Sequence, residues 1–156
     1  MEEKRVKDSR VEQVYVVRAQ HINADNRLFG GYLMQWIDEV AGVVCRRHSK
    51  GAVTAIAIDN LQFKKGAFAN DTVVVVGQIS YVGTTSMEVR VDTYIEDFEG
   101  HRESINQAYV VMVAIDENGR PRKVPTLKLE TEEEKKEWEA GARRWALRKQ
   151  RREEAF

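Results

Sequence analysis

One carboxylate lies within the most apolar helical pattern of the sequence. Asp38 follows a polar loop that begins at His21, and its helical pattern ends near His48. Apolar neighbours cover most of the helix circumference at about 100° per residue; they are Leu33, Met34, Trp36, Ile37, Val40, Ala41, Val43 and Val44. We expect this helix to be largely buried, and partial burial favours the neutral acid unless a donor compensates. Asp38 is therefore a candidate catalytic carboxylate facing a cavity; the alternative is an acid that reaches water or caps a neighbouring loop.

Two consecutive glycines open this helix. Gly30 and Gly31 permit close backbone approach and a positive φ, and they leave the first N–H groups of the helix uncovered by side chains. Such donors suit a developing oxyanion. Two glycines alone would indicate a simple tight turn, but Asn23 and Asn26 precede them and Asp38 follows. An amide, backbone donors and a carboxylate therefore gather at one helix end, which favours a catalytic site.

The composition bounds the class of protein. The chain has 156 residues, enough for one domain with a real core, and its 25 basic and 25 acidic residues create no overall field for nucleic acid or an anionic membrane. The one cysteine, Cys45, lies inside the apolar helix, where packing is its expected role. The charged N-terminus lacks the apolar region of a signal peptide, and no segment approaches the roughly 20 apolar residues that span a bilayer. These features predict a soluble, cytoplasmic protein with no nucleic-acid or membrane partner.

The order of the periodic segments predicts one α+β domain. A β-branched segment, residues 11–18, precedes the long helix, and four further β segments follow it, at residues 53–63, 71–81, 86–98 and 104–115. No helical pattern separates these four, and their glycine-containing breaks indicate hairpins. We therefore expect an antiparallel sheet wrapped around one long buried helix. Residues 1–10 are polar and predict a flexible N-terminus, so the domain covers residues 11–128.

A second helix of different character is expected in a C-terminal extension, residues 129–156. Thr131 and Glu134 have capping-box spacing, acids fill the first turn, and bases dominate the later turns. A thin apolar stripe would pack on the body of the protein or on a sister subunit; its members are Trp138, Ala142, Trp145 and Ala146. The basic residues could meet phosphate, but a solvated helix face is the commoner outcome. The sheet itself has edges, so a dimer that continues it would remove one edge and bring the glycine site near the subunit interface.

Several motifs, in order and at compatible spacing, resemble one family. They are Asn23 with Phe29-Gly30-Gly31, then Leu33-Met34, Trp36-Ile37-Asp38-Glu39, Val53-Thr54-Ala55, Asn70-Asp71, Gly83-Thr84-Thr85-Ser86-Met87-Glu88-Val89, and the ending from Val113 to Pro125. Over residues 14–127 the chain resembles the hotdog-fold acyl-CoA thioesterases, both the bacterial type and the cytosolic brain-type hydrolases. The resemblance implies a hotdog fold and an acyl-CoA thioester hydrolase that converts fatty acyl-CoA to free fatty acid and CoA. It also implies a dimer, and a hexamer built as a trimer of dimers.

The resemblance assigns roles to matching positions. It implies that Asp38 is the general base or the nucleophile, and that Asn23 orients the water or the thioester across the dimer interface. It implies that the N–H of Gly31, with Gly30 beside it, binds the thioester oxygen, and that Thr54 lines the same site. A further segment resembles the part of the family's chain that contacts CoA; it consists of Thr85, Ser86 and Met87.

The chemistry needs no metal and no cofactor, since CoA is part of the substrate and then a product. A CoA thiolate leaves readily near neutral pH, so one acid, one amide and a backbone donor suffice. The histidines His21, His48 and His101 lie on separate elements without ligand spacing, so no metal site is expected. Two alternatives stay open. A hotdog dehydratase or hydratase acting on acyl thioesters would need an acid–base histidine, for which His21 is the candidate; a non-catalytic acyl-CoA-binding module would be expected to lack the acid or the glycine.

Overall fold

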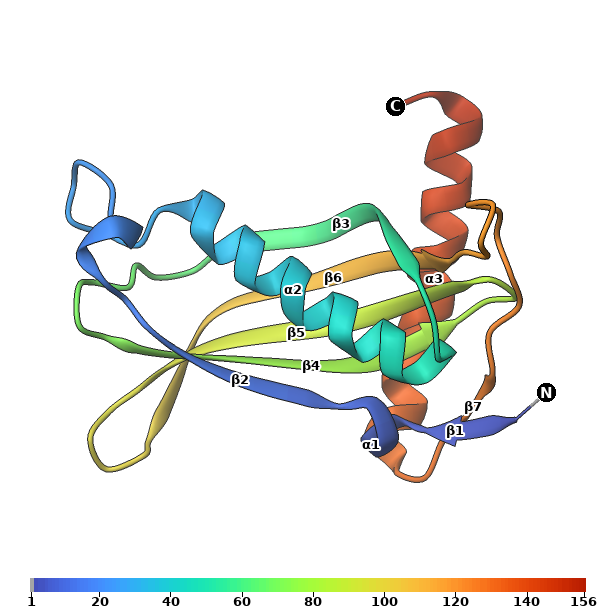
Figure 1. Ribbon diagram of the computed structural model, residues 1–156, viewed down its shortest axis with the longest axis horizontal. Coiled ribbons are helices and arrows are strands. Elements are labelled where there is room, and N and C mark those ends of the chain that lie inside the picture. The colour runs from blue at the N-terminus through green and yellow to red at the C-terminus, as the bar shows by residue number, and fades with distance from the viewer. Residues whose placement is uncertain (1) are drawn as a thin grey trace.

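A five-stranded antiparallel sheet wraps around one long helix in the computed structural model, which describes residues 2–156 (Figure 1). The strand order is β2-β4-β5-β6-β3. The strands are β2 (Val11–Val16), β3 (Val53–Phe63), β4 (Thr72–Val82), β5 (Ser86–Glu96) and β6 (Arg102–Ala114). Helix α2 (Gly30–Ser49) lies along one face of the sheet, and α3 (Glu132–Glu154) crosses the opposite face. The predicted α+β class, antiparallel sheet, long helix and C-terminal helix are confirmed.

The core lies between α2 and the sheet. On β5, the side chains of Met87, Val89 and Val91 are fully buried. They share a face because successive side chains of a strand point to opposite sides. The helix approaches the sheet most closely over Gly77 of β4, where a Cβ atom would lie 2.8 Å from Cγ1 of Val40.

Helix α3 begins as predicted and packs on the outer face of the same sheet. The Thr131 side chain accepts a hydrogen bond from the N–H of Glu134 at 3.1 Å. The Trp138 ring lies 4.4 Å from the Tyr81 ring, measured between centroids. Gly141 permits close contact with β4, since a Cβ atom there would lie 2.6 Å from Cβ of Tyr81. The helix therefore covers the body of its own chain.

Two of the three predicted hairpins are confirmed, and the third is wrong. Strands β4 and β5, and strands β5 and β6, pair antiparallel as neighbours. Strand β3 instead pairs with β6 at the far edge, and residues 64–71 cross back to β4. This loop also has a backbone partner: the N–H of Leu28, in the segment before α2, donates to the carbonyl of Ala67 at 2.8 Å. The loop therefore closes one end of the fold.

The prediction of a flexible N-terminus is wrong for residues 2–10, and Met1 lies outside the described residues. Strand β1 (Glu3–Arg5) pairs in parallel with β7 (Thr126–Lys128), and the short helix α1 (Val6–Ser9) follows. Val6 is only 4% exposed. A backbone partner from far along the chain and one buried valine thus order a segment whose polar composition predicts fraying.

One shoulder of α2 is open in the single chain. Met34 is 40% exposed, and Asp38, one turn later, is exposed as well. The expectation of a largely buried helix is therefore wrong along this shoulder, although the face that bears Trp36 and Ile37 is buried. A sheet of this width covers only part of the helix circumference. Despite the apolar pattern of α2, none of the helices within residues 2–156 is long and apolar enough to cross a bilayer.

Candidate active site

The N-terminal end of α2 presents two free backbone donors. Phe29 is the N-cap residue, and no side chain caps this helix. The N–H groups of Tyr32 and Leu33 donate to the Phe29 carbonyl, at 3.0 and 3.3 Å. The N–H groups of Gly30 and Gly31 come first in the helix, and no acceptor within residues 2–156 bonds to them. Together with the positive end of the helix dipole, they can bind an oxygen that carries negative charge.

Gly31 leaves room for an aromatic ring, and neither glycine uses the positive φ that it permits. Neither Gly30 nor Gly31 is among the residues with positive φ. A Cβ atom on Gly31 would lie 2.4 Å from the Phe29 ring, and one on Gly30 would lie 3.4 Å from the Phe63 ring. Two aromatic rings therefore lie against the first turn, and the predicted close approach is present.

A cavity of about 330 Å³ lies where α2 begins, and Asn23 and Gly30 both line it. The Asn23 Oδ1 atom accepts hydrogen bonds from the N–H groups of Asp25, at 2.9 Å, and Arg27, at 3.2 Å. These bonds fix the carboxamide and leave its NH₂ group to donate. The inner wall of the cavity is apolar; it includes Leu28, Leu33, Phe63 and Ile105. Three basic residues, Arg27, Lys64 and Lys65, also line the cavity. The structure thus brings the predicted amide and the predicted helix start to one cavity that has an apolar wall and basic side chains.

Asp38 lies on the shoulder of α2 that faces β3. Its neighbour Glu39 faces the other side, because it accepts a hydrogen bond from the Tyr15 hydroxyl of β2 at 3.4 Å. Gly42, one turn after Asp38, faces β6, where an added Cβ atom would lie 3.9 Å from the Met112 methyl group. The Asp38 carboxylate is exposed, and within residues 2–156 no side chain pairs with it. Its expected partial burial is therefore wrong for the single chain, because the sheet ends at β3.

One chain keeps the acid apart from the backbone donors. Asp38 and Gly31 lie on the same straight helix, seven residues apart. At 1.5 Å per residue, this separation is about 10 Å along the helix axis. The carboxylate of Asp38 therefore cannot act on a carbonyl that is bound at the Gly31 N–H of its own chain.

The remaining predicted contacts lie at the other end of the sheet. Thr54 on β3 and Ser86 on β5 both pair with Val113 of β6, and Thr85 precedes Ser86. Phe63, beside Gly30, is level with Asn106 of β6 and Thr93 of β5. Ser86 is seven residues from Thr93, which is about 23 Å along the strand at roughly 3.3 Å per residue. The Met87 side chain is fully buried in the core between the sheet and α2. The expectation that this side chain contacts CoA is therefore corrected, because strand alternation turns it inward.

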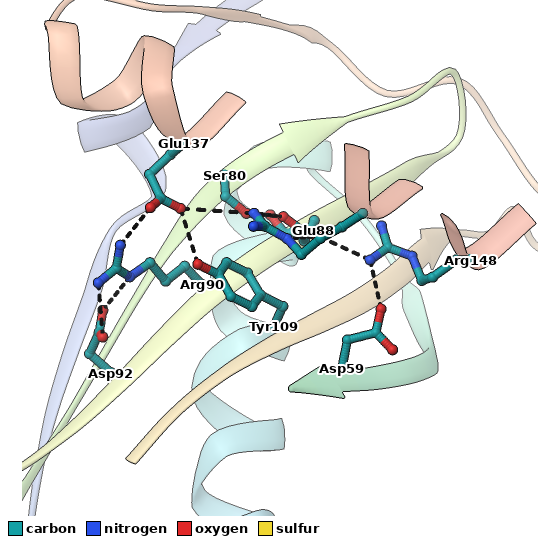
Figure 2. A network of polar contacts seen from close by, with 9 residues as sticks. Asp59, Ser80, Glu88, Arg90, Asp92, Tyr109, Glu137 and Arg148 are labelled. Atoms are coloured by element: carbon teal, nitrogen blue, oxygen red, sulfur yellow. Dashed lines mark hydrogen bonds and ion pairs between the residues drawn. The ribbon is translucent and has the colours of Figure 1, made fainter. Parts of the chain in front are cut away.

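Two arginines of α3 belong to a buried ion network on the outer face of the sheet (Figure 2). Glu88, which is 1% exposed, accepts hydrogen bonds from Arg144 at 2.8 and 3.0 Å and from Arg148 at 3.0 Å. The Ser80 hydroxyl donates to the same carboxylate at 2.6 Å, and Arg148 also donates to Asp59 of β3 at 2.9 Å. Burial alone would lower the pKa of Arg144, but its bonds to Glu88 raise that pKa overall. Neither phosphate binding nor a solvated face describes these two arginines.

His21, the only candidate for an acid–base histidine near the loop, is held by its surroundings. Its Nδ1 atom accepts a hydrogen bond from the N–H of Arg18 at 3.0 Å. The ring packs edge-on against Tyr32 and Trp36, with centroids 5.0 and 5.2 Å away. The histidine therefore shapes the loop that carries Asn23.

Comparisons with known proteins agree with this fold. Residues 25–99 match the family model of the thioesterase superfamily. An acyl-CoA thioester hydrolase of Bacillus subtilis, described as uncharacterized, is 36% identical over 129 residues, which are 82% of this chain and 75% of the relative. The cytosolic acyl coenzyme A thioester hydrolase of mouse is 30% identical over 80% of this chain, but the chain spans only 33% of that longer protein.

Solved structures are similar over nearly the whole chain. The acyl-CoA hydrolase of Staphylococcus aureus, determined with butyryl coenzyme A, coenzyme A and coenzyme A disulfide, has a TM-score of 0.92 and 32% identity, over 98% of this chain and 94% of that one. An apo hexameric acyl-CoA thioesterase has a TM-score of 0.92 and 34% identity, over 97% of both chains. The resemblance found in the sequence is thereby confirmed. The chain belongs to the acyl-CoA thioester hydrolases of the thioesterase superfamily, and its α+β architecture is the hotdog fold of that family.

Proposed function

We propose that this protein hydrolyses fatty acyl-CoA to free fatty acid and CoA at a site shared between two subunits. The observation that carries the proposal is the uncapped start of α2, where the N–H groups of Gly30 and Gly31 have no acceptor within residues 2–156 and Gly30 lines a cavity that Asn23 also lines. Two backbone donors and a helix dipole stabilise the oxyanion that forms when a thioester carbonyl is attacked. The apolar wall of the cavity suits an acyl chain.

The second subunit would supply the acid. Strand β3 is an 11-residue edge strand, and Ile56 and Phe63 on it are 53% and 55% exposed. Pairing β3 with its own copy about a two-fold axis continues the antiparallel sheet and covers these side chains together with Met34. Because Asp38 lies on the shoulder of α2 that faces β3, the same contact would turn it toward the cavity of the partner.

The proposed reaction uses one group from each part of this site. Asp38 of one subunit takes a proton from a water molecule that Asn23 of the other subunit orients, and the water oxygen bonds to the thioester carbon. The carbonyl oxygen becomes an oxyanion on the Gly31 N–H. The C–S bond then breaks, and CoA leaves as a thiolate that takes up a proton. Direct attack by the carboxylate, with water cleaving the resulting anhydride, would use the same geometry. Neither route draws on a metal or a cofactor.

Related structures support the choice of residues. The Staphylococcus aureus hydrolase was also determined with an aspartate, with an asparagine and with a threonine replaced by alanine, the asparagine variant in complex with coenzyme A. The interval between that aspartate and that asparagine is the same as the interval between Asp38 and Asn23 here. We extend the proposal to Thr54 as a residue that lines the site and to Thr85 and Ser86 as contacts to CoA. Hexameric relatives support assembly as a trimer of dimers, and the cytosolic mouse relative supports a cytoplasmic location.

The proposal is tested by CoA release, measured with a thiol reagent over saturated acyl-CoAs of increasing length. Asp38→Asn should lower kcat by about 10²- to 10⁴-fold, the usual contribution of a general base. Glu39→Gln is the matched control, since Glu39 is the next residue, is exposed and faces β2, and it should retain full activity. His21→Ala should still release CoA. Hydration of an enoyl-CoA without release of CoA, or an increase in melting temperature with no turnover, would replace hydrolysis by one of the alternative functions.

Mixed dimers test whether the site is shared. Neither Asp38→Asn nor Asn23→Ala should be active alone, but in a mixed dimer one site receives both wild-type residues. Co-expression of the two variants at equal levels should therefore restore about a quarter of the wild-type activity, because half of the dimers are mixed and each has one intact site. No recovery in dimers proven to be mixed would mean that both residues act within one chain.

A further inference from the structure

Two buried oxygen atoms without a protein partner lie side by side beneath the first half of α2. They are Oγ1 of Thr93 on β5 and Oδ1 of Asn106 on β6, and both residues are fully buried. The two residues are direct cross-strand partners. Asn106 donates through Nδ2 to the carbonyl of Gln62 at 2.6 Å, which fixes the amide so that its oxygen is the free atom. Within residues 2–156 no group bonds to either oxygen, an unfavourable state for buried polar atoms.

These oxygens lie directly behind the wall of the cavity at the glycine end of α2. Phe63 is the cross-strand partner of Asn106 on β3, and its ring lines the cavity and lies close to Gly30. Cross-strand partners point to the same face, so Asn106 and Thr93 also face the helix. Ile105, the residue before Asn106, lines the cavity too, and a register shift leaves it without a partner on β5. One row across the sheet thus leads from the cavity to the two oxygens.

We propose that Thr93 and Asn106 form a subsite for a hydroxyl group on the acyl chain, so that the preferred substrates are hydroxyacyl-CoA thioesters. The inference rests on the proposed hydrolase function and names the substrate class of that site. The Asn106 oxygen only accepts hydrogen bonds, whereas the Thr93 hydroxyl accepts or donates. A substrate hydroxyl can therefore bond to both atoms, but a carboxylate would be repelled by the amide oxygen. A plain alkyl chain that reached this depth would leave both oxygens unpaired.

A buried hydroxyl alone is no evidence of a subsite, and the chain offers a control for this point. The Oγ atom of Ser9, on α1, is also buried without a partner. None of the three residues lines the cavity itself, but Asn106 adjoins the lining residues Phe63 and Ile105, whereas no chain neighbour of Ser9 lines it. What sets Thr93 apart is its position, beside a second free oxygen and behind the cavity wall. Ser9→Ala therefore removes a buried hydroxyl without touching the subsite.

The test compares kcat/KM for acyl-CoAs that carry a hydroxyl group, moved one carbon at a time along the chain, with their alkyl parents. In the wild type, at least one hydroxylated substrate should be preferred by about tenfold or more, the size expected when a built hydrogen-bonding site meets its donor. Thr93→Val keeps the shape and breaks no hydrogen bond with the protein, so its melting temperature should not fall. It should nevertheless reduce the preference severalfold, and Ser9→Ala should leave the preference unchanged.

The same comparison is made by calorimetric binding of thioether analogues to Asp38→Asn, which does not depend on turnover. The proposal is overturned if no hydroxyl position is preferred in either measurement, or if Thr93→Val leaves the preference intact. In either case the two oxygens would serve only to bind a buried water molecule. Failure of the proposed function looks different: no CoA is released from any thioester, whereas the binding preference for a hydroxylated analogue persists.

Discussion

Replacing Glu88 by glutamine measures what holds α3 on the sheet. The change keeps the size of the side chain but removes a charge that is 1% exposed and accepts hydrogen bonds from Arg144 and Arg148 (Figure 2). These arginines are themselves 15% and 8% exposed at the side chain, so water replaces little of the lost interaction. Breaking a buried ion pair by removing one partner costs about 3–5 kcal/mol, because the other charge stays buried. For a chain of this size each kcal/mol corresponds to about 2–4 °C, so the melting temperature should fall by roughly 6 to 20 °C.

The melting temperature and the free energy of unfolding of Glu88→Gln are measured by thermal and urea unfolding. The protein concentration is kept fixed, because assembly contributes to stability. The matched control is Glu103→Gln, which removes an exposed ion pair with Lys65 at 2.9 Å and should cost at most about 1 kcal/mol. Equal effects of the two variants would refute the reasoning. In that case apolar contacts, such as those of Trp138 with Tyr81, would hold the helix, and the charged network would contribute little.

Two further predictions follow from buried titratable groups. Burial lowers the pKa of His48 below its ordinary 6.5, although its bond to the Pro125 carbonyl opposes this, so the unfolded chain binds the proton first as the pH falls. Stability to urea should therefore be constant above about pH 6.5 and decline as the pH falls toward the lowered pKa, and His48→Gln should remove this part of the slope; a flat wild-type profile would contradict the assignment. Burial also raises the pKa of Cys45 to about 12, so a thiol reagent should label the protein only after unfolding, and immediate labelling of the native protein would contradict its burial.

The sequence predicted the elements well where the pattern is local. Strand β3 has the predicted bounds, and α3 begins directly after the predicted cap, Thr131, because alternation and capping are properties of neighbouring residues. The order of strands is a different matter. Sequence neighbours β3 and β4 lie apart because β3 pairs with β6, and this pairing is decided by packing across the whole sheet. The ordered N-terminus escaped prediction for the same reason, since its partner β7 is distant in the chain.

The ion network could have been predicted from two features of the sequence taken together. Alternation along β5 puts Glu88 on the face away from α2, and the later turns of the C-terminal helix are basic. Arg144 and Arg148 are four residues apart and so share one helix face. Once the helix is placed on the outer face of the sheet, these two features predict an ion pair. The acid on the sheet face needs a cation, and the two arginines on one face of the helix supply it.

The candidate site was predicted only in part because part of it does not exist in one chain. Asn23 and Gly30 line one cavity, and Gly31 follows Gly30 directly, as the sequence indicated, because the three residues are close in the chain. Asp38 is also close in the chain, but a straight helix fixes it about 10 Å from Gly31, and no movement of side chains within the helix closes that gap. On the proposed mechanism the acid and the oxyanion donors are complementary halves. Each subunit carries the acid and the donors, but their spacing prevents both from acting on one carbonyl. On this mechanism, catalysis therefore requires strand β3 to pair with β3 of a second subunit.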